Sequence, residues 1–147
     1  MFQSVKENKV DKVMCLDVGT KRIGVALSDY LHITVSGHGC VLRVPENDAI
    51  EQIKTIAKEN NVKTIVVGVP VNMDGTQGAQ AQDCKTFAEK LKVVISDCDI
   101  IFEDERLTSD LAEENLRERK IDFRKDKSLV DIESACIILQ QYLSRVN

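Results

Sequence analysis

Residues 13–27 constrain the fold most strongly, because they contain two apolar runs that flank a short polar turn. The first run ends at Asp17 and the second begins at Ile23. Gly19 favours a sharp connection between them, so the pattern predicts a β-hairpin. A carboxylate at the end of a buried strand is costly to desolvate unless a cation or hydrogen-bond donors pair with it. Asp17 is therefore either a turn-capping residue or part of a site that binds a cation.

Predicted strands and amphipathic helices alternate along the rest of the chain, which indicates an α/β fold. The chain has 147 residues, of which 43% are hydrophobic, enough to bury the core of one domain spanning 1–147 with a polar N-terminal extension at 1–12. Two short apolar runs, Ile33–Ser36 and Cys40–Val44, are expected to complete an antiparallel meander. The later elements are helices at 48–60, 79–92, from 108 and from 128, and strands at 64–69 and 99–102.

The composition excludes several classes of protein. Five scattered cysteines without Cys-x-x-Cys spacing indicate reduced core residues, and the two histidines lack zinc-like spacing. No apolar run reaches membrane-spanning length, and the polar start lacks the apolar region of a signal peptide. We therefore expect a cytoplasmic protein that makes no membrane contact.

Three acidic side chains stand at positions where a shared site can form. Asp17 ends the first strand, Glu105 or its neighbour Asp104 ends a later strand, and Asp131 lies in the first turn of the last helix. Strand alternation aims Glu103 in the same direction as Glu105. Three carboxylates without histidine or cysteine partners form the oxygen ligand set that Mg²⁺ or Mn²⁺ prefers. Two such ions can promote hydrolysis of a phosphodiester.

Basic and polar side chains near these acids are candidates for substrate binding. Segment 117–127 holds six basic and three acidic residues, so it is either a phosphate-binding segment or a solvated loop. The loop after the strand at 64–69 borders the ligand crevice of an open α/β sheet. The candidate substrate-binding residues are Lys21, Arg22, Asn72, Asp74, Arg106, Arg124, Lys125 and Lys127.

Four segments together match one known family. They read Asp-Val-Gly-Thr-Lys-Arg-Ile-Gly-Val-Ala from residue 17, Val-Gly-Val-Pro-Val-Asn-Met-Asp-Gly-Thr from 67, Asp-Glu-Arg-Leu-Thr-Ser from 104, and Val-Asp-Ile-Glu-Ser-Ala-Cys-Ile-Ile-Leu-Gln from 130. In this order they resemble the YqgF family, also called RuvX, whose members are described as pre-16S rRNA nucleases and were formerly labelled Holliday junction resolvases. The resemblance covers the chain from about Val13 to Leu143.

The resemblance implies an RNase H-like fold, with a five-stranded mixed sheet whose first three strands are antiparallel, flanked by helices. It also implies metal-dependent cleavage by Asp17, Glu105 and Asp131, with Asp104 as the runner-up to Glu105. In this hypothesis Asp17 bridges two Mg²⁺ or Mn²⁺ ions and the other two acids hold one ion each. Water would then attack the phosphodiester to leave a 5′-phosphate and a 3′-hydroxyl.

The substrate and the class of function remain open at this level. Within the nuclease interpretation, precursor rRNA and branched DNA are both candidates, and junction resolution would require a symmetric dimer rather than a monomer. A non-catalytic protein that binds ribosomal or transcription components is the alternative from another class. Asp-x-Gly-Thr also occurs in actin-like ATPases, but these need two such domains to enclose a nucleotide.

Overall fold

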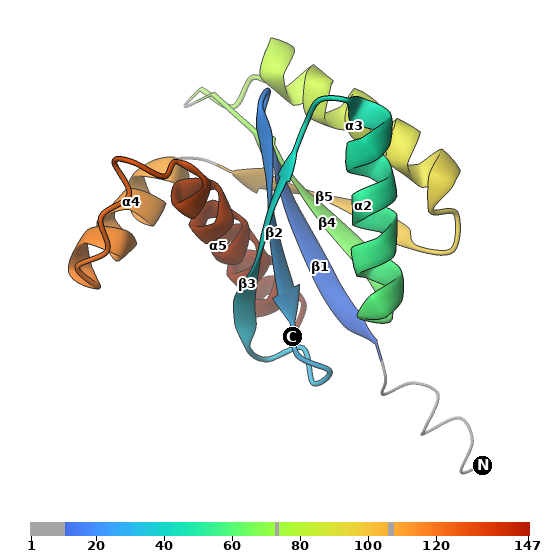
Figure 1. Ribbon diagram of the computed structural model, residues 1–147, viewed down its shortest axis with the longest axis horizontal. Coiled ribbons are helices and arrows are strands. Elements are labelled where there is room, and N and C mark those ends of the chain that lie inside the picture. Colours follow the sequence, from blue (N-terminus) through green and yellow to red (C-terminus); the bar gives the residue numbers. More distant parts are fainter. Residues whose placement is uncertain (1–10, 73, 106–107) are drawn as a thin grey trace.

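The computed structural model describes residues 11–72, 74–105 and 108–147. These residues form a five-stranded sheet in the order β3-β2-β1-β4-β5 (Figure 1). The first three strands are antiparallel, and the last two are parallel to β1. This arrangement confirms the predicted mixed sheet; most of the predicted extension 1–12 lies outside the described residues. The strands are β1 (Lys12–Val18), β2 (Arg22–Ser28), β3 (Val35–Leu42), β4 (Val62–Pro70) and β5 (Asp99–Glu105).

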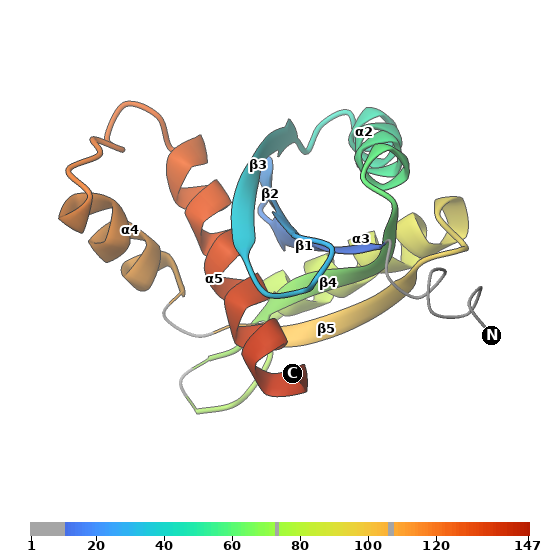
Figure 2. The same cartoon turned by 90° about the horizontal axis from the view of Figure 1, so that it is seen from below.

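Helices cover both faces of the sheet. One face packs against α2 (Glu46–Glu59) and α3 (Ala79–Val94), and the other against α5 (Ser128–Val146). A further helix, α4 (Thr108–Glu118), packs on the outer side of α5, away from the sheet (Figures 1 and 2). The sequence predicted all four helices, because each carries apolar residues at helical spacing or a clear start signal.

The alternating directions of the side chains along β1 determine which face of the sheet Asp17 lies on. Met14 and Leu16 belong to the core beneath α2 and α3, whereas Val13 and Cys15 belong to the core beneath α5. Successive side chains of a strand point to opposite faces, so Asp17 faces α5. The first strand thus delivers its carboxylate to the side of the sheet on which α5 begins.

The third strand differs from the prediction. It is continuous over Val35–Leu42, and both Ile33 and Val44, at the outer ends of the two predicted runs, lie outside it and are 69% and 72% exposed. A register shift between Val25 and Ala26 of β2 accommodates the longer pairing. Because β3 is an edge strand held largely by backbone hydrogen bonds, hydropathy alone gave the wrong boundaries.

Arg43, just after β3, ties the turn between β1 and β2 to the helices. Its guanidinium donates to the carbonyl oxygen of Gly19 at 2.9 Å and to both carboxylate oxygens of Asp83 on α3 at 3.0 Å. It also pairs with Glu46 at the start of α2 and is only 8% exposed. A buried charge needs such paired, hydrogen-bonded surroundings, so Arg43 fixes the turn that follows Asp17.

Two predictions from composition can be compared with the structure directly. All five cysteines are free and four of them are buried, as predicted. None of the helices in the described ranges is long and apolar enough to cross a membrane.

Candidate active site

The three predicted acids come from separate elements that meet at one edge of the sheet. Asp17 lies near the end of β1, Glu105 is the last residue of β5, and Asp131 lies in the first turn of α5. Because β1, β4 and β5 are parallel, their carboxyl ends share an edge. After desolvation, the negative charges of Glu105 and Asp131 also raise the pKa of Asp17, so both acids lie near it. The structure therefore brings together three side chains that the sequence separates by up to 114 residues (131 − 17).

Two glycines on the strands beside β1 allow this convergence. A Cβ atom on Gly24, the partner of Asp17 on β2, would lie 2.1 Å from the backbone oxygen of Asp131. A Cβ atom on Gly68 of β4 would lie 2.3 Å from Oε2 of Glu105. Both positions require the close approach that only glycine permits. Nothing in the local sequence marks these two positions, because the atoms they accommodate belong to distant parts of the chain.

Replacing Gly24 with alanine is expected to destabilise the protein by about 1–3 kcal/mol, because the new methyl group meets backbone atoms that cannot rotate away. The start of α5, with Asp131, would have to move away from the sheet. Denaturant unfolding measures the loss. Gly78→Ala is the matched control, because nothing lies within 4 Å of its added Cβ atom; equal stability of both variants would contradict the packing argument.

Burial raises the pKa values of two of the three acids, Asp17 and Glu105. The pKa of Asp17 is raised well above its ordinary value, first by desolvation and then by the charges of Glu105 and Asp131. Desolvation raises the pKa of Glu105 to about 7. Its Oε2 atom is buried and has no hydrogen-bond partner among the described residues. Burial therefore disfavours the ionised forms of both Asp17 and Glu105.

Asp131 already has a cationic partner. Its Oδ2 atom accepts a hydrogen bond from Nε of Arg22 at 2.7 Å, so the first turn of α5 is tied to the start of β2. As the side chains stand, the described residues include no group of three His, Cys, Asp or Glu side chains arranged to hold a metal ion. The acids are neighbours, but Asp131 is engaged by Arg22 rather than shared with Asp17 and Glu105. The assignment of the three as metal ligands therefore stays a prediction.

The alternative acids on β5 differ from Glu105 in direction or pairing. Ile101 packs in the core beneath α5, so alternation places Glu103 and Glu105 on that face and Asp104 on the opposite one. Glu103 is buried and pairs with Arg145 near the end of α5. Among the described residues, Glu105 is the one of these three consecutive acids whose buried carboxylate oxygen has no hydrogen-bond partner.

The chemistry of these acids fits a divalent cation. The donors are all carboxylate oxygens, and the pKa values of two of the acids, Asp17 and Glu105, are raised. The buried Oε2 atom of Glu105 has no hydrogen-bond partner among the described residues. A cation would relieve both the desolvation and the repulsion, since hard divalent ions prefer such oxygen ligands. Arg22 bonds Oδ2 of Asp131, so a cation held by all three acids would meet this acid at Oδ1 or in the place of Arg22.

The predicted substrate-binding residues outside segment 117–127 have different surroundings. Lys21 is exposed in the turn after β1, and Arg22 pairs with Asp131. In the loop after β4, Nδ2 of Asn72 donates to Oγ1 of Thr76, whose hydroxyl donates in turn to Oδ1 of Asp74. These bonds shape the loop from within. The prediction for Arg106 lies outside the described residues.

The basic segment borders a pocket next to Asp131. This pocket has a volume of about 330 Å³ and is lined by Arg22, Glu113, Phe123, Arg124, Lys127, Val130 and Asp131. Arg124 pairs with Asp122, with Nε 3.1 Å from Oδ1, whereas Lys125 is exposed. Three of the predicted basic residues, Arg22, Arg124 and Lys127, thus line the same pocket as a candidate catalytic acid.

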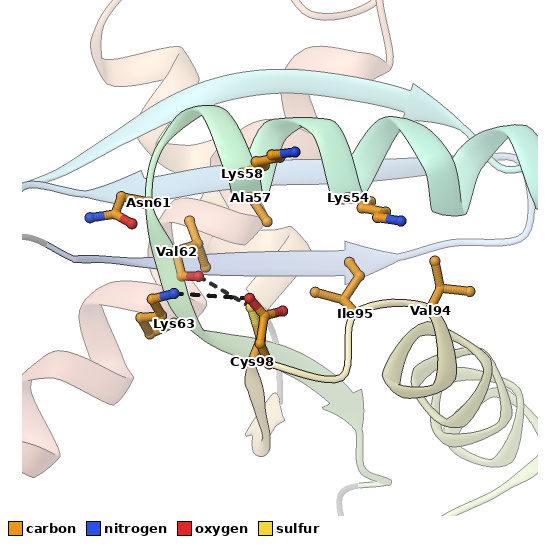
Figure 3. Close-up of a pocket in the computed structure, with 10 residues that line it drawn as sticks. Lys54, Ala57, Lys58, Asn61, Val62, Lys63, Val94, Ile95 and Cys98 are labelled. Atoms are coloured by element: carbon orange, nitrogen blue, oxygen red, sulfur yellow. Dashed lines mark hydrogen bonds and ion pairs between the residues drawn. The ribbon is translucent and has the colours of Figure 1, made fainter.

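A second pocket lies at the opposite end of the sheet and contains none of the candidate acids. It has a volume of about 260 Å³ and lies where β4 and β5 begin (Figure 3). Lys54 and Lys58 of α2 line one side of it, and Lys63 pairs with Asp97 at 3.9 Å. The pocket is far along the strands from their carboxyl ends, so it is separate from the candidate active site.

Solved structures support the fold. Residues of this chain superpose on the Fowlpox virus resolvase in complex with Holliday junction DNA with a TM-score of 0.58 at 12% identity, covering 92% of this chain and 98% of that one. The Thermus thermophilus RuvC structure in complex with a Holliday junction substrate gives 0.53 at 9% identity, covering 93% and 96%. At this low identity the likeness shows the fold alone, which is RNase H-like as predicted.

Sequence comparisons are far closer. A Clostridioides difficile protein named "Putative pre-16S rRNA nuclease" is 42% identical over 90% of this chain and 93% of its own length. A Halalkalibacterium halodurans protein of the same name is 41% identical, over 91% and 96%. The family model described as "RuvX: Holliday junction resolvase" matches residues 11–145. The match therefore includes every candidate catalytic acid, and the chain belongs to the RuvX family.

Proposed function

We propose that this protein is a metal-dependent endonuclease that hydrolyses phosphodiester bonds in precursor 16S rRNA during maturation of its 5′ end. The observation that carries the proposal is the meeting of Asp17, Glu105 and Asp131 at the carboxyl edge of the sheet. The names of the 40% identical relatives supply the substrate. The site of action would be the cytoplasm, with precursor rRNA as the partner and ribosomal or transcription components nearby.

In this proposal Asp17, Glu105 and Asp131 hold Mg²⁺ or Mn²⁺ in the two-ion arrangement that the family resemblance implies. A divalent cation bound there would polarise the phosphodiester and stabilise charge on the leaving oxygen. Arg22, released from Asp131, would then be free to pair with a substrate phosphate, because guanidinium groups bind phosphate oxygens well. Lys21, on the same turn, adds a second positive charge.

Resolution of branched DNA is the second candidate, because the matching family carries that description. A junction must be cut at two symmetric positions, so this activity requires two active sites in a homodimer. A monomer would fit RNA processing better. The third possibility, a non-catalytic binding protein, leaves the perturbed acids without a role.

Incubation with end-labelled precursor rRNA and with a labelled four-way junction, each in Mg²⁺ or Mn²⁺, tests the proposal. We expect cleavage of the RNA to fragments with 5′-phosphate ends, no cleavage in EDTA, and at most weak cutting of the junction. Paired symmetric nicks in the junction, with intact RNA, would favour the resolvase. Failure to cut either substrate would favour the non-catalytic alternative.

A further inference from the structure

We propose that the pocket beside Asp131 receives one unpaired nucleotide of a single-stranded polynucleotide, with its base against Phe123. This inference rests on the proposed function and deepens it by naming the substrate class: a strand that is single-stranded next to the bond that is cut. The juxtaposition that carries it is one aromatic ring, several cations and a candidate catalytic acid around one pocket.

The pocket has a suitable size and position. Its volume of about 330 Å³ falls in the range of small-ligand sites, roughly 300–1,000 Å³. Val130 and Asp131 of its lining come from the start of α5, and Phe123, Arg124 and Lys127 come from segment 117–127. A nucleotide held there would place its neighbouring phosphate close to the acids.

Phe123 is placed to stack on a base. It belongs to neither hydrophobic core cluster of the described residues and is only half-buried. The guanidinium carbon of Arg117 lies 5.5 Å from its ring centroid, in a neighbouring pocket of about 460 Å³ that Phe123 also lines. A cation over the ring holds it in place. Since Arg117 does not line the pocket beside Asp131, the ring can serve that pocket as well.

The charges around the pocket fit a phosphate and a base together. Lys127 forms no salt bridge with any described residue, so its ammonium group is available to a phosphate. Arg22 and Arg124 each have one carboxylate partner, Asp131 and Asp122. Glu113 accepts a hydrogen bond from Arg117 at Oε1, 3.2 Å away, and its other carboxylate oxygen can accept one from the amino group of a base.

These features favour unpaired nucleotides over a duplex. A paired base is stacked and hydrogen-bonded within its helix, and extracting it costs a few kcal/mol. An unpaired base enters the pocket at little cost in free energy. Every base can stack on an aromatic ring, because each has a π face. The pocket is therefore expected to discriminate by strandedness rather than by sequence.

Phe123→Leu tests the inference, with Phe102→Leu as the matched control. Phe102 is a phenylalanine with an accessible ring, 44% exposed, that lies on β5 in a different pocket. The probe is a fluorescein-labelled oligoadenylate of twelve nucleotides, free or annealed to oligouridylate, with binding followed by anisotropy in EDTA. We expect Phe123→Leu to weaken single-strand binding about tenfold. Duplex binding should change less than twofold, and Phe102→Leu should change neither.

A second variant, a folding check and a second probe make the outcome decisive. Phe123→Tyr keeps the ring and should restore binding, while thermal melts verify that each variant is folded. The deoxy form of the oligomer distinguishes RNA from DNA as the source of the strand. Unchanged single-strand binding in Phe123→Leu, or an equal loss for the duplex, would overturn the inference. Because these measurements need no cleavage, an inactive wild-type protein that still shows the Phe123 effect would refute the nuclease proposal while leaving the pocket assignment standing.

Discussion

Asp17→Asn is expected to lower the rate of RNA cleavage by about 10³-fold, because asparagine keeps the shape of the side chain but removes its negative charge. Asp17 is the acid that interacts with both of the others, so its charge is central to holding any cation between them. Single-turnover cleavage of labelled precursor rRNA in Mg²⁺ measures the effect.

The fold of this variant should be intact, which separates a catalytic loss from unfolding. Burial and two neighbouring carboxylates raise the pKa of Asp17, so its ionised form destabilises the metal-free protein, and a neutral replacement should be at least as stable as the wild type. Asp97→Asn, a highly exposed acid at the other end of the sheet, is the control and should cleave normally. Cleavage by Asp17→Asn at the wild-type rate would remove Asp17 from the mechanism.

The sequence could predict where the acids stand because strands and helices have regular geometry. Asp17 and Glu105 follow apolar runs, and parallel strands end at one edge, so both were expected there. Hydropathy did not decide whether Asp104 or Glu105 is the candidate ligand on the later strand. The family resemblance, rather than any spacing, favoured Glu105. The structure adds that Asp104 lies on the opposite face of β5 from Ile101 and Glu105.

Contacts between distant segments could not be predicted. The hydrogen bond between Arg22 and Asp131 joins residues 109 positions apart, and nothing in either local sequence specifies it. Gly24 and Gly68 read as ordinary strand residues until the atoms above them are known. Phe123, in an irregular charged segment, gave no periodic signal at all.

The pairing of Arg22 with Asp131 offsets part of the negative charge that the three acids bring together. Desolvation, followed by repulsion from Glu105 and Asp131, raises the pKa of Asp17, while the guanidinium of Arg22 pairs with Asp131. If the cation takes the place of Arg22 on Asp131, as proposed, the guanidinium is left beside the incoming phosphate. Metal binding and substrate binding are thus expected to favour each other. The metal frees Arg22 for the substrate phosphate, and the phosphate draws Arg22 away from Asp131, which is then free for the metal.

Glu105→Gln is expected to stabilise the metal-free protein at pH 8 by about 1–3 kcal/mol and to abolish most cleavage. Desolvation raises the pKa of Glu105 from its ordinary value of 4.5 to about 7 in the folded state. Between these values the unfolded chain loses the proton while the folded chain keeps it, so stability falls as the pH rises. Above pH 7 the full cost is present, and below pH 4.5 it disappears. Glutamine does not titrate and avoids the cost.

Denaturant unfolding in EDTA at pH 5 and pH 8 measures this difference, which should be clearly larger at pH 8. Added Mg²⁺ or Mn²⁺ should raise the melting temperature of the wild type at pH 8, because a bound cation stabilises the ionised acids, and should have little effect on Glu105→Gln. Asp104→Asn distinguishes the neighbouring acids: we expect it to keep both the pH dependence and the response to metal. If Asp104→Asn instead lost the response while Glu105→Gln kept it, the ligand on β5 would be Asp104.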